Sequence, residues 1–265
     1  MAKSKVSAIC TDYDETLTTE DTTERLLLRI KELTPQNQRA DFNRIWTDAS
    51  VKYRMELARI YSEVLTLHFS DPSERLNYLS NRINNLEIES SAQVFPLFKY
   101  ITKEQLRKEG AKIQLLPKAR KVLKEFKEKK LPAYVISLNW SRDMIEASLS
   151  GVIEETNIFC NNLVFRNNAA DGGLELCVNS PQDKLTRMKS LASSQRIAYA
   201  GNGVNDILCI LSAKYGFIIN PQSPLLQLLE TVGISADKIK DPARTDKPGI
   251  YLIDSWADIK GVLTV

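Results

Sequence analysis

The sequence predicts an α/β fold in which a parallel sheet is covered by helices on both faces and carries a helical insertion. Four apolar runs have the length of strands: Val6–Cys10, Ala133–Ser137, Arg196–Ala200 and Tyr215–Ile219. The last three each follow a helix-like segment, and continuous apolar strands that alternate with helices are typical of a parallel sheet buried on both faces. Active sites in such sheets lie at the carboxyl ends of the strands, so the residues after each strand are the functional candidates.

The segment after the first strand departs from this alternation. Between Thr18 and Gln114 apolar residues recur at three- and four-residue spacings, which is typical of helices. Prolines interrupt the pattern at Leu33-Thr34-Pro35 and at Ser70-Asp71-Pro72-Ser73. We therefore expect a helical insertion of nearly a hundred residues that is broken at these two points.

This pattern divides the chain into two expected units. Residues 1–18 and 115–265 would form the α/β core, and residues 19–114 would form the helical insertion. Pro117 then opens a helix over Lys118–Lys129 that returns the chain to the sheet, because proline is favoured in the first helical turn.

The composition is that of an ordinary globular protein. The 265 residues are 43% hydrophobic and 26% charged, with a formal net charge of +3. The most basic stretch, Lys118–Lys130, alternates with apolar residues and predicts a solvated helix face rather than a nucleic-acid-binding surface. No apolar run reaches the roughly 18 residues that a membrane-spanning helix needs, and the first residues do not resemble a secretory signal.

The cysteine pattern indicates a reducing compartment. The four cysteines are far apart and lie in apolar surroundings: Cys10, Cys160, Cys177 and Cys209. Buried free thiols are the expected state of such residues. We therefore expect a cytoplasmic protein. We also expect a monomer or homodimer without nucleic-acid or membrane partners.

Two aspartates directly follow the first predicted strand. Asp12 and Asp14 alternate in Cys10-Thr11-Asp12-Tyr13-Asp14-Glu15-Thr16-Leu17, so both side chains should project to the same side. Carboxylates this close repel each other, and a metal ion or a shared proton is expected there. An acidic turn is the alternative, because Asp and Thr both favour turns at strand ends.

Ser137 and Lys184 are two further polar candidates. Ser137 ends the second predicted strand, where a hydroxyl can donate to a phosphate oxygen beside backbone N–H groups. A plain helix N-cap is the alternative for this serine. Lys184 lies at the start of a predicted helix, where a cation is slightly unfavourable to the helix dipole, and this indicates some other use. An ordinary surface lysine is the alternative there.

The third predicted strand runs into Gly201-Asn202-Gly203-Val204-Asn205-Asp206. Its two glycines permit a tight turn close to a ligand, and Asp206 offers a hard oxygen for Mg²⁺. Taken alone, the segment is explained equally well by an ordinary Gly-Asn turn. The four polar signals carry more weight together, because three of them follow strands of one predicted sheet.

In the order of these elements the sequence resembles the haloacid dehalogenase superfamily. Asp12 and Asp14 match its first catalytic motif, Ser137 the second, Lys184 the third and Asp206 the fourth. The insertion is similar to the helical cap of the phosphoserine-phosphatase-like branch. The resemblance spans the whole chain and implies a Rossmann-like core with an inserted α-helical cap.

This resemblance implies a phosphatase that acts on a small phosphorylated metabolite. Asp12 would attack phosphorus and form an aspartyl-phosphate, and Asp14 would protonate the leaving alcohol and then activate water. Asp14 also favours a phosphatase over a dehalogenase, because a halide leaving group needs no acid. The implied phosphate-binding residues are Ser137, Leu138 and Lys184, and the implied Mg²⁺ ligands are Asp12, Asp14, Asn202 and Asp206.

The fourth motif departs from the family pattern at one position. The pattern Gly-Asp-Gly-x-x-Asp has an acid where this chain has Asn202, and an amide is a weaker Mg²⁺ ligand than a carboxylate. Either Asp206 holds the metal with help from the Asn202 carbonyl, or metal binding is weak. A catalytically weakened protein that binds phosphometabolites or has a regulatory role is therefore the alternative function.

A cysteine-dependent phosphatase is a further alternative. Cys160 and Arg166 have the minimal spacing of that enzyme's phosphate loop, but the residues between them lack glycine and alternate like a strand. Such a segment cannot easily turn its amides toward an anion. The lone histidine, His68, lies in the helical insertion, where a structural role is expected.

Residues of the insertion should set substrate specificity, since the cap of this family contacts the leaving group. The insertion offers aromatic and basic side chains: Phe42, Trp46, Tyr53, Tyr61, Arg44, Lys52 and Arg54. This mixture suits a small ring-bearing or polar phosphate ester, although each residue could equally pack the cap. The segment Ser137-Leu138-Asn139-Trp140 also resembles phosphatases that act on thiamine or related vitamin phosphates.

Overall fold

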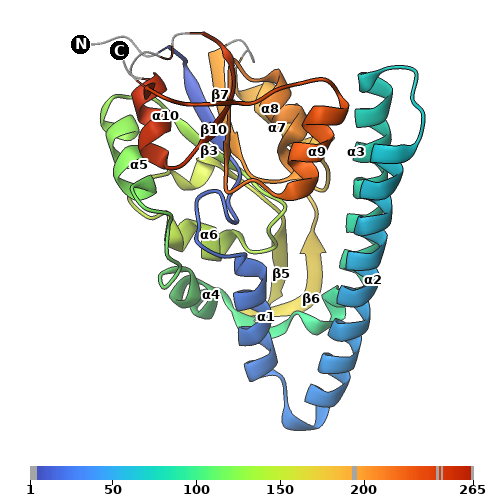
Figure 1. Ribbon diagram of the computed structural model, residues 1–265. Coiled ribbons are helices and arrows are strands. Elements are labelled where there is room, and N and C mark those ends of the chain that lie inside the picture. The colour runs from blue at the N-terminus through green and yellow to red at the C-terminus, as the bar shows by residue number, and fades with distance from the viewer. Residues whose placement is uncertain (1–4, 193–195, 243–244, 246, 264–265) are drawn as a thin grey trace.

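A seven-stranded sheet forms the centre of the molecule, and all its neighbouring strands are parallel (Figure 1). The computed structural model describes residues 5–192, 196–242, 245 and 247–263. The strand order is β4-β3-β1-β7-β8-β10-β9. In chain order the strands are β1 (Ala8–Thr11), β3 (Ala133–Ile136), β4 (Ile158–Phe159), β7 (Ile197–Gly201), β8 (Tyr215–Ile219), β9 (Asp237–Lys238) and β10 (Gly249–Ile253).

The four strands predicted from apolar runs are present as β1, β3, β7 and β8. The bounds of β8 agree with the prediction, and the other three differ by one or two residues. β1 lies between β3 and β7, with Thr11 in register with Val135 on one side and Ala200 on the other. The carboxyl ends of these three strands therefore lie at the same level of the sheet.

Helices cover both faces of this sheet, as expected for buried parallel strands. The side chains of β1 alternate, so that Ile9 packs in one apolar cluster and Cys10 in the other. Helices α5, α6 and α10 contribute to the first cluster, and α7, α8 and α9 to the second. These helices are α5 (Ala119–Glu128), α6 (Arg142–Ser148), α7 (Pro181–Leu191), α8 (Ile207–Ser212), α9 (Ser223–Thr231) and α10 (Trp256–Leu263).

The expected insertion contains four α-helices, two of which form a long antiparallel hairpin (Figure 1). They are α1 (Thr22–Leu33), α2 (Arg39–Thr66), α3 (Pro72–Val94) and α4 (Lys103–Gly110). The helix breaks coincide with the predicted prolines: α1 ends before Pro35, and Asp71 caps α3 by accepting hydrogen bonds from the N–H groups of Ser73 and Glu74. Such a cap with proline in the first turn is a common start of a helix.

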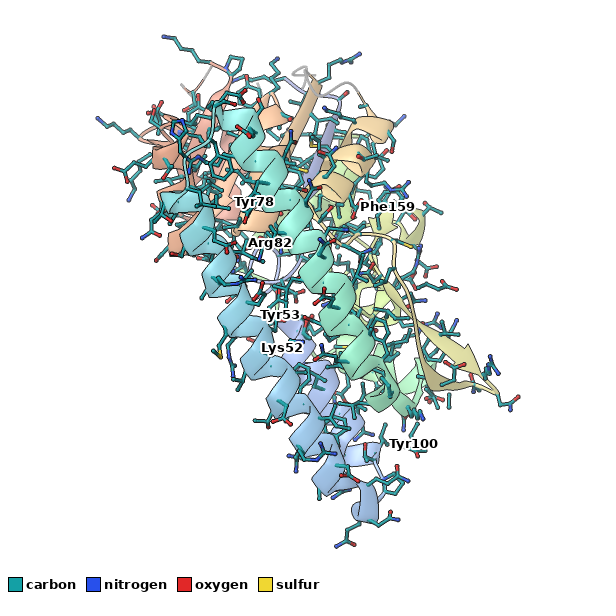
Figure 2. The ribbon with its side chains drawn as sticks, turned by 90° about the vertical axis from the view of Figure 1, so that its right-hand side faces the viewer. Lys52, Tyr53, Tyr78, Arg82, Tyr100 and Phe159 are labelled. Carbon is teal, nitrogen blue, oxygen red and sulfur yellow. The ribbon has the colours of Figure 1, made fainter. Side chains whose placement is uncertain are left out.

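The α2–α3 hairpin packs directly on the core. Ile60 of α2 and Ile83 of α3 are buried in the same apolar cluster as Leu185 of α7 and Leu228 of α9. Polar contacts also join the two helices, since Arg82 pairs with Glu63 at 2.6 Å. Figure 2 shows Tyr53, Tyr78 and Arg82 spaced along this hairpin.

The expected helical insertion also contributes a strand, which the sequence analysis did not predict. β2 (Lys99–Thr102) pairs antiparallel with β6 (Ala169–Glu175), which in turn pairs with β5 (Asn162–Arg166). This three-stranded sheet therefore combines both expected units. The chain leaves and re-enters the core at Thr18 and Leu115, which face each other in an isolated antiparallel bridge.

Short 3₁₀ helices complete the described elements. They are η1 (Gln36–Gln38), η2 (Phe95–Leu97), η3 (Glu155–Asn157) and η5 (Val204–Asp206). Helix α5 begins one residue later than predicted, because Lys118 has a left-handed backbone with φ of 69°. Among the residues that the structure describes, no helix is both long and apolar enough to cross a membrane.

Candidate active site

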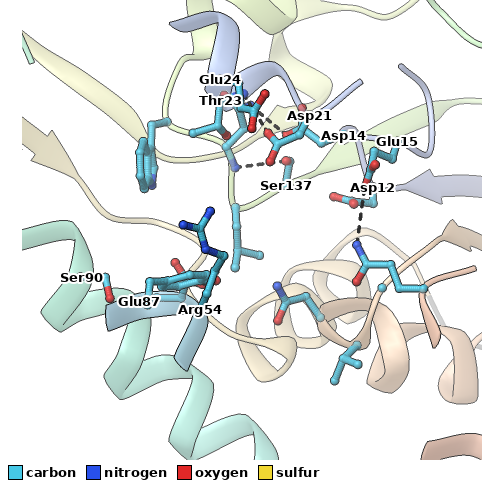
Figure 3. Close-up of a pocket in the computed structure, with 18 of the residues that line it drawn as sticks. Asp12, Asp14, Glu15, Asp21, Thr23, Glu24, Arg54, Glu87, Ser90 and Ser137 are labelled. Carbon is cyan, nitrogen blue, oxygen red and sulfur yellow. Dashed lines mark hydrogen bonds between the residues drawn. The ribbon is translucent and has the colours of Figure 1, made fainter. Parts of the chain in front are cut away.

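A cavity of about 400 Å³ opens at the carboxyl ends of β1, β3 and β7 (Figure 3). All the candidate residues named from the sequence line it: Asp12, Asp14, Ser137, Leu138, Lys184, Asn202 and Asp206. Figure 3 shows Asp12, Asp14 and Ser137 at one end of the cavity, with Arg54, Glu87 and Ser90 of the hairpin at the other. The fold thus brings segments from five parts of the chain to one place.

Lys184 forms the electrostatic centre of this site. Its Nζ lies 2.7 Å from Oδ1 of Asp12 and 2.8 Å from Oδ1 of Asp206, and its side chain is only 2% exposed. Burial disfavours the charged ammonium, but the two carboxylates outweigh this and hold the pKa of Lys184 above its ordinary value. The lysine therefore carries a fixed positive charge beside Asp12, and the surface-lysine alternative is wrong.

Asp12 is placed by the end of β1. Its backbone N–H donates to the carbonyl of Ala200 at 2.9 Å, which continues the pairing of β1 with β7. Burial raises the pKa of Asp12 to about 7, while the adjacent Lys184 lowers it. The side chain of Asp12 is 12% exposed and the residue lines the cavity, so a ligand can reach it.

Asp206 is held by four hydrogen bonds. Oδ1 accepts from Lys184 and from the Tyr199 hydroxyl at 2.7 Å, and Oδ2 accepts from the N–H groups of Asn202 and Gly203, each at 3.1 Å. Gly201 makes room for it, because a Cβ at that position would lie 2.5 Å from Asp206. In this arrangement Asp206 orients Lys184 and the loop after β7, and its role as a direct metal ligand stays a prediction.

The carboxylate of Asp14 turns toward the start of the insertion. Oδ1 accepts from the N–H and the hydroxyl of Thr22 at 2.8 and 2.7 Å, and Oδ2 accepts from the Asn139 side-chain amide at 2.9 Å. Burial, followed by the nearby charge of Asp21, raises the pKa of Asp14 to about 6. A carboxyl that titrates near neutrality can both give and accept a proton.

Ser137 lies directly after β3 and is buried. Its Oγ accepts a hydrogen bond from the N–H of Asn139 at 3.1 Å, in a turn that continues to the N-cap of α6 at Ser141. Ser137 is therefore not the helix cap that the alternative interpretation assigned to it. Both Ser137 and Leu138 line the cavity, and they follow β3, which lies on the other side of β1 from β7.

Glu15 is a cavity residue that the sequence analysis did not single out. Its carboxylate Oε2 accepts a hydrogen bond from the Asn202 side-chain amide at 3.3 Å and one from Gln222 at 3.5 Å. The Asn220 side chain donates to its backbone carbonyl at 3.2 Å. The loops after β1, β7 and β8 thus converge on one carboxylate.

The donors at this end of the cavity fit a hard divalent cation. Carboxylate, amide and backbone carbonyl oxygens are the ligands that Mg²⁺ prefers, and Oδ1 of Asn205, which lines the cavity, is buried without a hydrogen-bond partner. The carboxylates of Asp12, Asp14, Glu15 and Asp206 are among those that lie here beside the ammonium of Lys184, so a phosphate group would be repelled unless a cation offsets them. Within the described part of the chain, no three His, Cys, Asp or Glu side chains are clustered as a ready metal site.

The hairpin supplies the opposite wall of the cavity. Of the residues of the insertion considered from the sequence, four line it: Trp46, Tyr53, Arg54 and Tyr61. Phe42 is instead buried in the packing of the insertion, and Arg44 and Lys52 are exposed outside this cavity. Tyr53 donates a 2.6 Å hydrogen bond to Glu87, and burial raises the pKa of Glu87 to about 7.

The cysteines and the histidine take no part in this site. Cys160 is buried, and burial raises the pKa of its thiol to about 12, so it is not a thiolate at neutral pH. This argues against the cysteine-phosphatase alternative. Cys10 and Cys209 are buried as expected, but Cys177, which follows β6, is exposed, so that expectation was wrong for one residue. His68 is exposed between α2 and α3.

Several supporting residues could be recognised only from the structure. Thr22 and Asn139 hold Asp14, and Tyr199 holds Asp206. Asn139 lies in the predicted second motif, so its position was visible, but its partner is 125 residues away. Thr22 and Tyr199 carry no distinguishing local pattern, and only the three-dimensional fold brings them to the site.

Comparison with curated proteins gives a relative that matches this chain over part of its length. No protein-family model matches the chain. The bifunctional TH2 protein, mitochondrial, of Arabidopsis thaliana is 25% identical over 215 residues, which cover 70% of this chain and 34% of that protein. The chain thus spans about a third of the length of this curated relative.

Solved structures with a similar fold are more numerous. A phosphoserine phosphatase described as a phospho-aspartyl intermediate analogue superposes with a TM-score of 0.54 at 17% identity, covering 85% of this chain and 91% of that one. A phosphoserine phosphohydrolase-like protein from Francisella tularensis gives 0.59 at 13% identity, with 97% and 99% covered. Cytosolic 5′-nucleotidase IIIB bound to cytidine gives 0.56 at 15% identity, with 96% and 82% covered.

Proposed function

Because the chain has the fold of the haloacid dehalogenase superfamily, with the helical cap of its phosphoserine-phosphatase-like branch, we propose that it is a Mg²⁺-dependent phosphoric monoester hydrolase. The observation that carries this proposal is the buried Lys184, paired with Asp12 and Asp206 at the floor of a cavity that Asp14 and Ser137 also line. A small phosphorylated metabolite is the proposed substrate.

Asp12 acts as the nucleophile in this proposal. Its carboxylate oxygen attacks phosphorus in line, a new P–O bond forms, and the bond from phosphorus to the leaving alcohol breaks. The product is an aspartyl-phosphate, which a water molecule then hydrolyses to inorganic phosphate and free Asp12. Lys184 supports both steps, because its fixed positive charge offsets the charge of the transferred group.

Asp14 moves the protons of the two steps. It donates a proton to the oxygen of the leaving alcohol and later takes one from the attacking water, which restores its starting state. Its raised pKa of about 6 suits both directions near neutral pH. Thr22 and Asn139 fix the carboxylate through three hydrogen bonds, so it does not need to reorient from solvent.

Ser137 and Leu138 would bind the remaining phosphate oxygens. The Ser137 hydroxyl and the Leu138 N–H lie after β3, and both residues line the cavity together with Lys184. Asp12, the Asp14 backbone carbonyl and Asn202 would hold Mg²⁺, with Asp206 behind them. The cation, when bound, supplies electrostatic stabilisation of the phosphoryl group.

The cavity volume supports a small substrate. About 400 Å³ is within the usual range of small-ligand pockets. Its far wall combines aromatic rings, Trp46, Tyr53 and Tyr61, with the guanidinium of Arg54 and the carboxyl group of Glu87. This combination suits a ring-bearing or polar leaving group. A screen of phosphoserine, nucleotides, pyridoxal phosphate and thiamine phosphate tests which ester is preferred.

The reaction is tested with 4-nitrophenyl phosphate, with Mg²⁺ and with a chelator. We expect turnover that requires the metal, that is lost in Asp12→Asn, and that persists in Cys160→Ser. Loss of turnover in Cys160→Ser while Asp12→Asn stays active would instead support a cysteine nucleophile.

A second candidate function rests on Asn202, which removes an acid from the fourth motif. A protein that binds phosphate esters without hydrolysing them would show substrate-induced thermal stabilisation but no release of phosphate. If Asn202→Asp also fails to produce metal-dependent turnover, this second function is the correct one.

A further inference from the structure

We infer that the carboxylate of Glu15 contributes negative charge to the Mg²⁺ site, where Asn202 stands in place of an acid. The inference rests on the proposed function, because it concerns the cation of that same site. It assigns a role to a residue outside the four matched motif positions. It also explains how a chain with an amide in the fourth motif could still bind a divalent cation.

The first line of support is the direct contact between the two residues. The Asn202 amide Nδ2 donates to Oε2 of Glu15 at 3.3 Å, so the Glu15 carboxylate lies beside the side chain that replaces the family's acid. Gln222 donates to the same oxygen at 3.5 Å. Glu15 is labelled at the Asp12 end of the cavity in Figure 3.

The second line of support is the way the backbone of Glu15 is held. Its φ is 57°, in the left-handed region that non-glycine residues seldom occupy. Its N–H donates to the Thr18 hydroxyl at 3.0 Å, and its carbonyl accepts from Asn220 at 3.2 Å. These contacts hold the backbone in an unfavourable conformation at a residue that lines the cavity.

The third line of support is the geometry of the loop after β7. Gly203 carries no side chain, and a Cβ there would lie 3.0 Å from Oε1 of Gln222. The Gln222 N–H also donates to the Asn202 carbonyl at 2.9 Å. The loops thus hold Gln222 and Asn202 together, with both amides donating to Glu15.

The charge balance explains why this position is useful. Asp206 is fully engaged by four hydrogen bonds, and Asp12 shares Lys184 with it. The carboxylate of Asp14 is likewise engaged, by Thr22 and Asn139, so a dication beside Asp12 gains little from Asp14 and Asp206 as direct ligands, and charge count sets cation affinity in oxygen sites. Glu15, in the loop after β1, adds a negative charge next to Asn202.

The inference is tested by titrating Mg²⁺ into the full chain and measuring heat. Four proteins are compared: wild type, Glu15→Gln, Asn202→Asp, and the double variant that carries both changes. The glutamine keeps the length of the side chain and the backbone conformation. The double variant exchanges acid and amide between the two positions, so it retains both the net charge and a hydrogen bond between them.

We expect Glu15→Gln to weaken Mg²⁺ binding by about 10- to 100-fold, the usual effect of removing a group that supports a metal site. Asn202→Asp in that background should recover most of the lost affinity. The matched control is Glu128→Gln, an exposed acid at the end of α5 that has no part in the cavity. It should bind Mg²⁺ as the wild type does.

The inference is overturned if Glu15→Gln binds Mg²⁺ with wild-type affinity, if Glu128→Gln loses as much, or if the wild type binds none. Thermal melting of each variant without metal separates loss of folding from loss of binding. The proposed function fails separately: a wild type that binds Mg²⁺ but hydrolyses no phosphate ester would contradict it and leave the Glu15 result intact.

Discussion

The side-chain amide of Asn139 donates a 2.9 Å hydrogen bond to Asp14, and its nitrogen lies equally close to the hydroxyl of Thr22. Asn139, a single residue in the turn after β3, thus fixes both Asp14, the proposed proton donor, and Thr22 at the start of the inserted segment. Asn139 in turn is held because its Oδ1 accepts from the N–H of Ser141, the cap of α6. The core and the insertion meet at this amide.

Replacing Asn139 by alanine should reduce kcat more than it raises KM. The change frees the Asp14 carboxylate to rotate, and loss of a supporting hydrogen bond at such sites costs about 10- to 100-fold in activity. Steady-state kinetics on a phosphate monoester measures the effect. The control is Asn81→Ala, an exposed position of α3. A rise in KM alone would show that Asn139 binds substrate rather than positioning Asp14.

Lys184→Met should destabilise the protein strongly, in addition to abolishing turnover. It leaves the carboxylates of Asp12 and Asp206 buried without their cation, and breaking a buried pair in this way costs about 3–5 kcal/mol. Urea unfolding gives the free energy. The double variant Lys184→Met with Asp206→Asn removes one of the unpaired charges and should recover part of the loss. An unchanged unfolding free energy in the single variant would contradict the ion-pair interpretation.

Gly201→Ala should lower stability by about 1–3 kcal/mol, the usual cost of overpacking. The added methyl group would lie 2.5 Å from Cβ and Cγ of Asp206, which is too close for any adjustment of rotamers alone. Gly249→Ala serves as the control, because the nearest atom to its Cβ is 3.3 Å away, at the end of the Tyr251 side chain. Equal losses in the two variants would mean that backbone effects, not contact with Asp206, set the cost.

Glu87 should make stability depend on pH. Burial raises its pKa from 4.5 to about 7, so its protonated form favours the folded state. This contribution is complete below about pH 4.5 and is lost as pH rises through about 7, with a maximum of about 3 kcal/mol. The groups that face it are Tyr53 and Tyr61 of α2, and Arg54 lines the same cavity.

Unfolding free energies from pH 5 to 8 test the role of Glu87. We expect them to fall with pH in the wild type and to stay flatter in Glu87→Gln, which mimics the neutral acid. Glu89→Gln, an exposed change on the same helix, should keep the wild-type slope. The same slope in Glu87→Gln as in the wild type would assign the pH dependence to another group.

Thiol labelling should distinguish Cys177 from the other cysteines. It is exposed, whereas Cys10, Cys160 and Cys209 are buried, and burial raises the pKa of each of these three thiols. A chromogenic disulfide reagent should therefore modify one thiol rapidly in the native protein and all four after denaturation. Cys177→Ser should remove the rapid phase, and a rapid phase that survives this change would show that a second thiol is accessible.

Much of the core could be predicted because its signals are local. Buried parallel strands appear in the sequence as apolar runs, and both bounds of β8 were predicted correctly. β10 was missed because its exposure alternates only partly and a glycine begins it, and β4 and β9 are too short to leave a pattern. β2 was missed because it lies in a segment dominated by helix formers and is formed through pairing with the distant β6.

The candidate site could be predicted in part for the same reason. The residues that end strands, such as Asp12 and Ser137, are located by the strands themselves. The contact between Glu15 and Asn202 joins positions 187 residues apart, and nothing in the local sequence around either residue predicts it. The exposure of Cys177 was likewise hidden, because its neighbour Val178 is buried in the core and the local sequence is apolar.

The way the α2–α3 hairpin is anchored limits how substrate can enter. Ile60, Val64, Leu79 and Ile83 join the hairpin to the helices of the core, and withdrawing such side chains into water costs about 1.5–3 kcal/mol each. A lid that swung away as one rigid piece would pay this for all four at every turnover. Phe42, Ala49 and Val94, toward the other end of the hairpin, are buried in a second apolar cluster with Met144 of α6. Both ends of the hairpin are therefore anchored, and entry of the ester and release of the phosphate must leave most of these contacts in place.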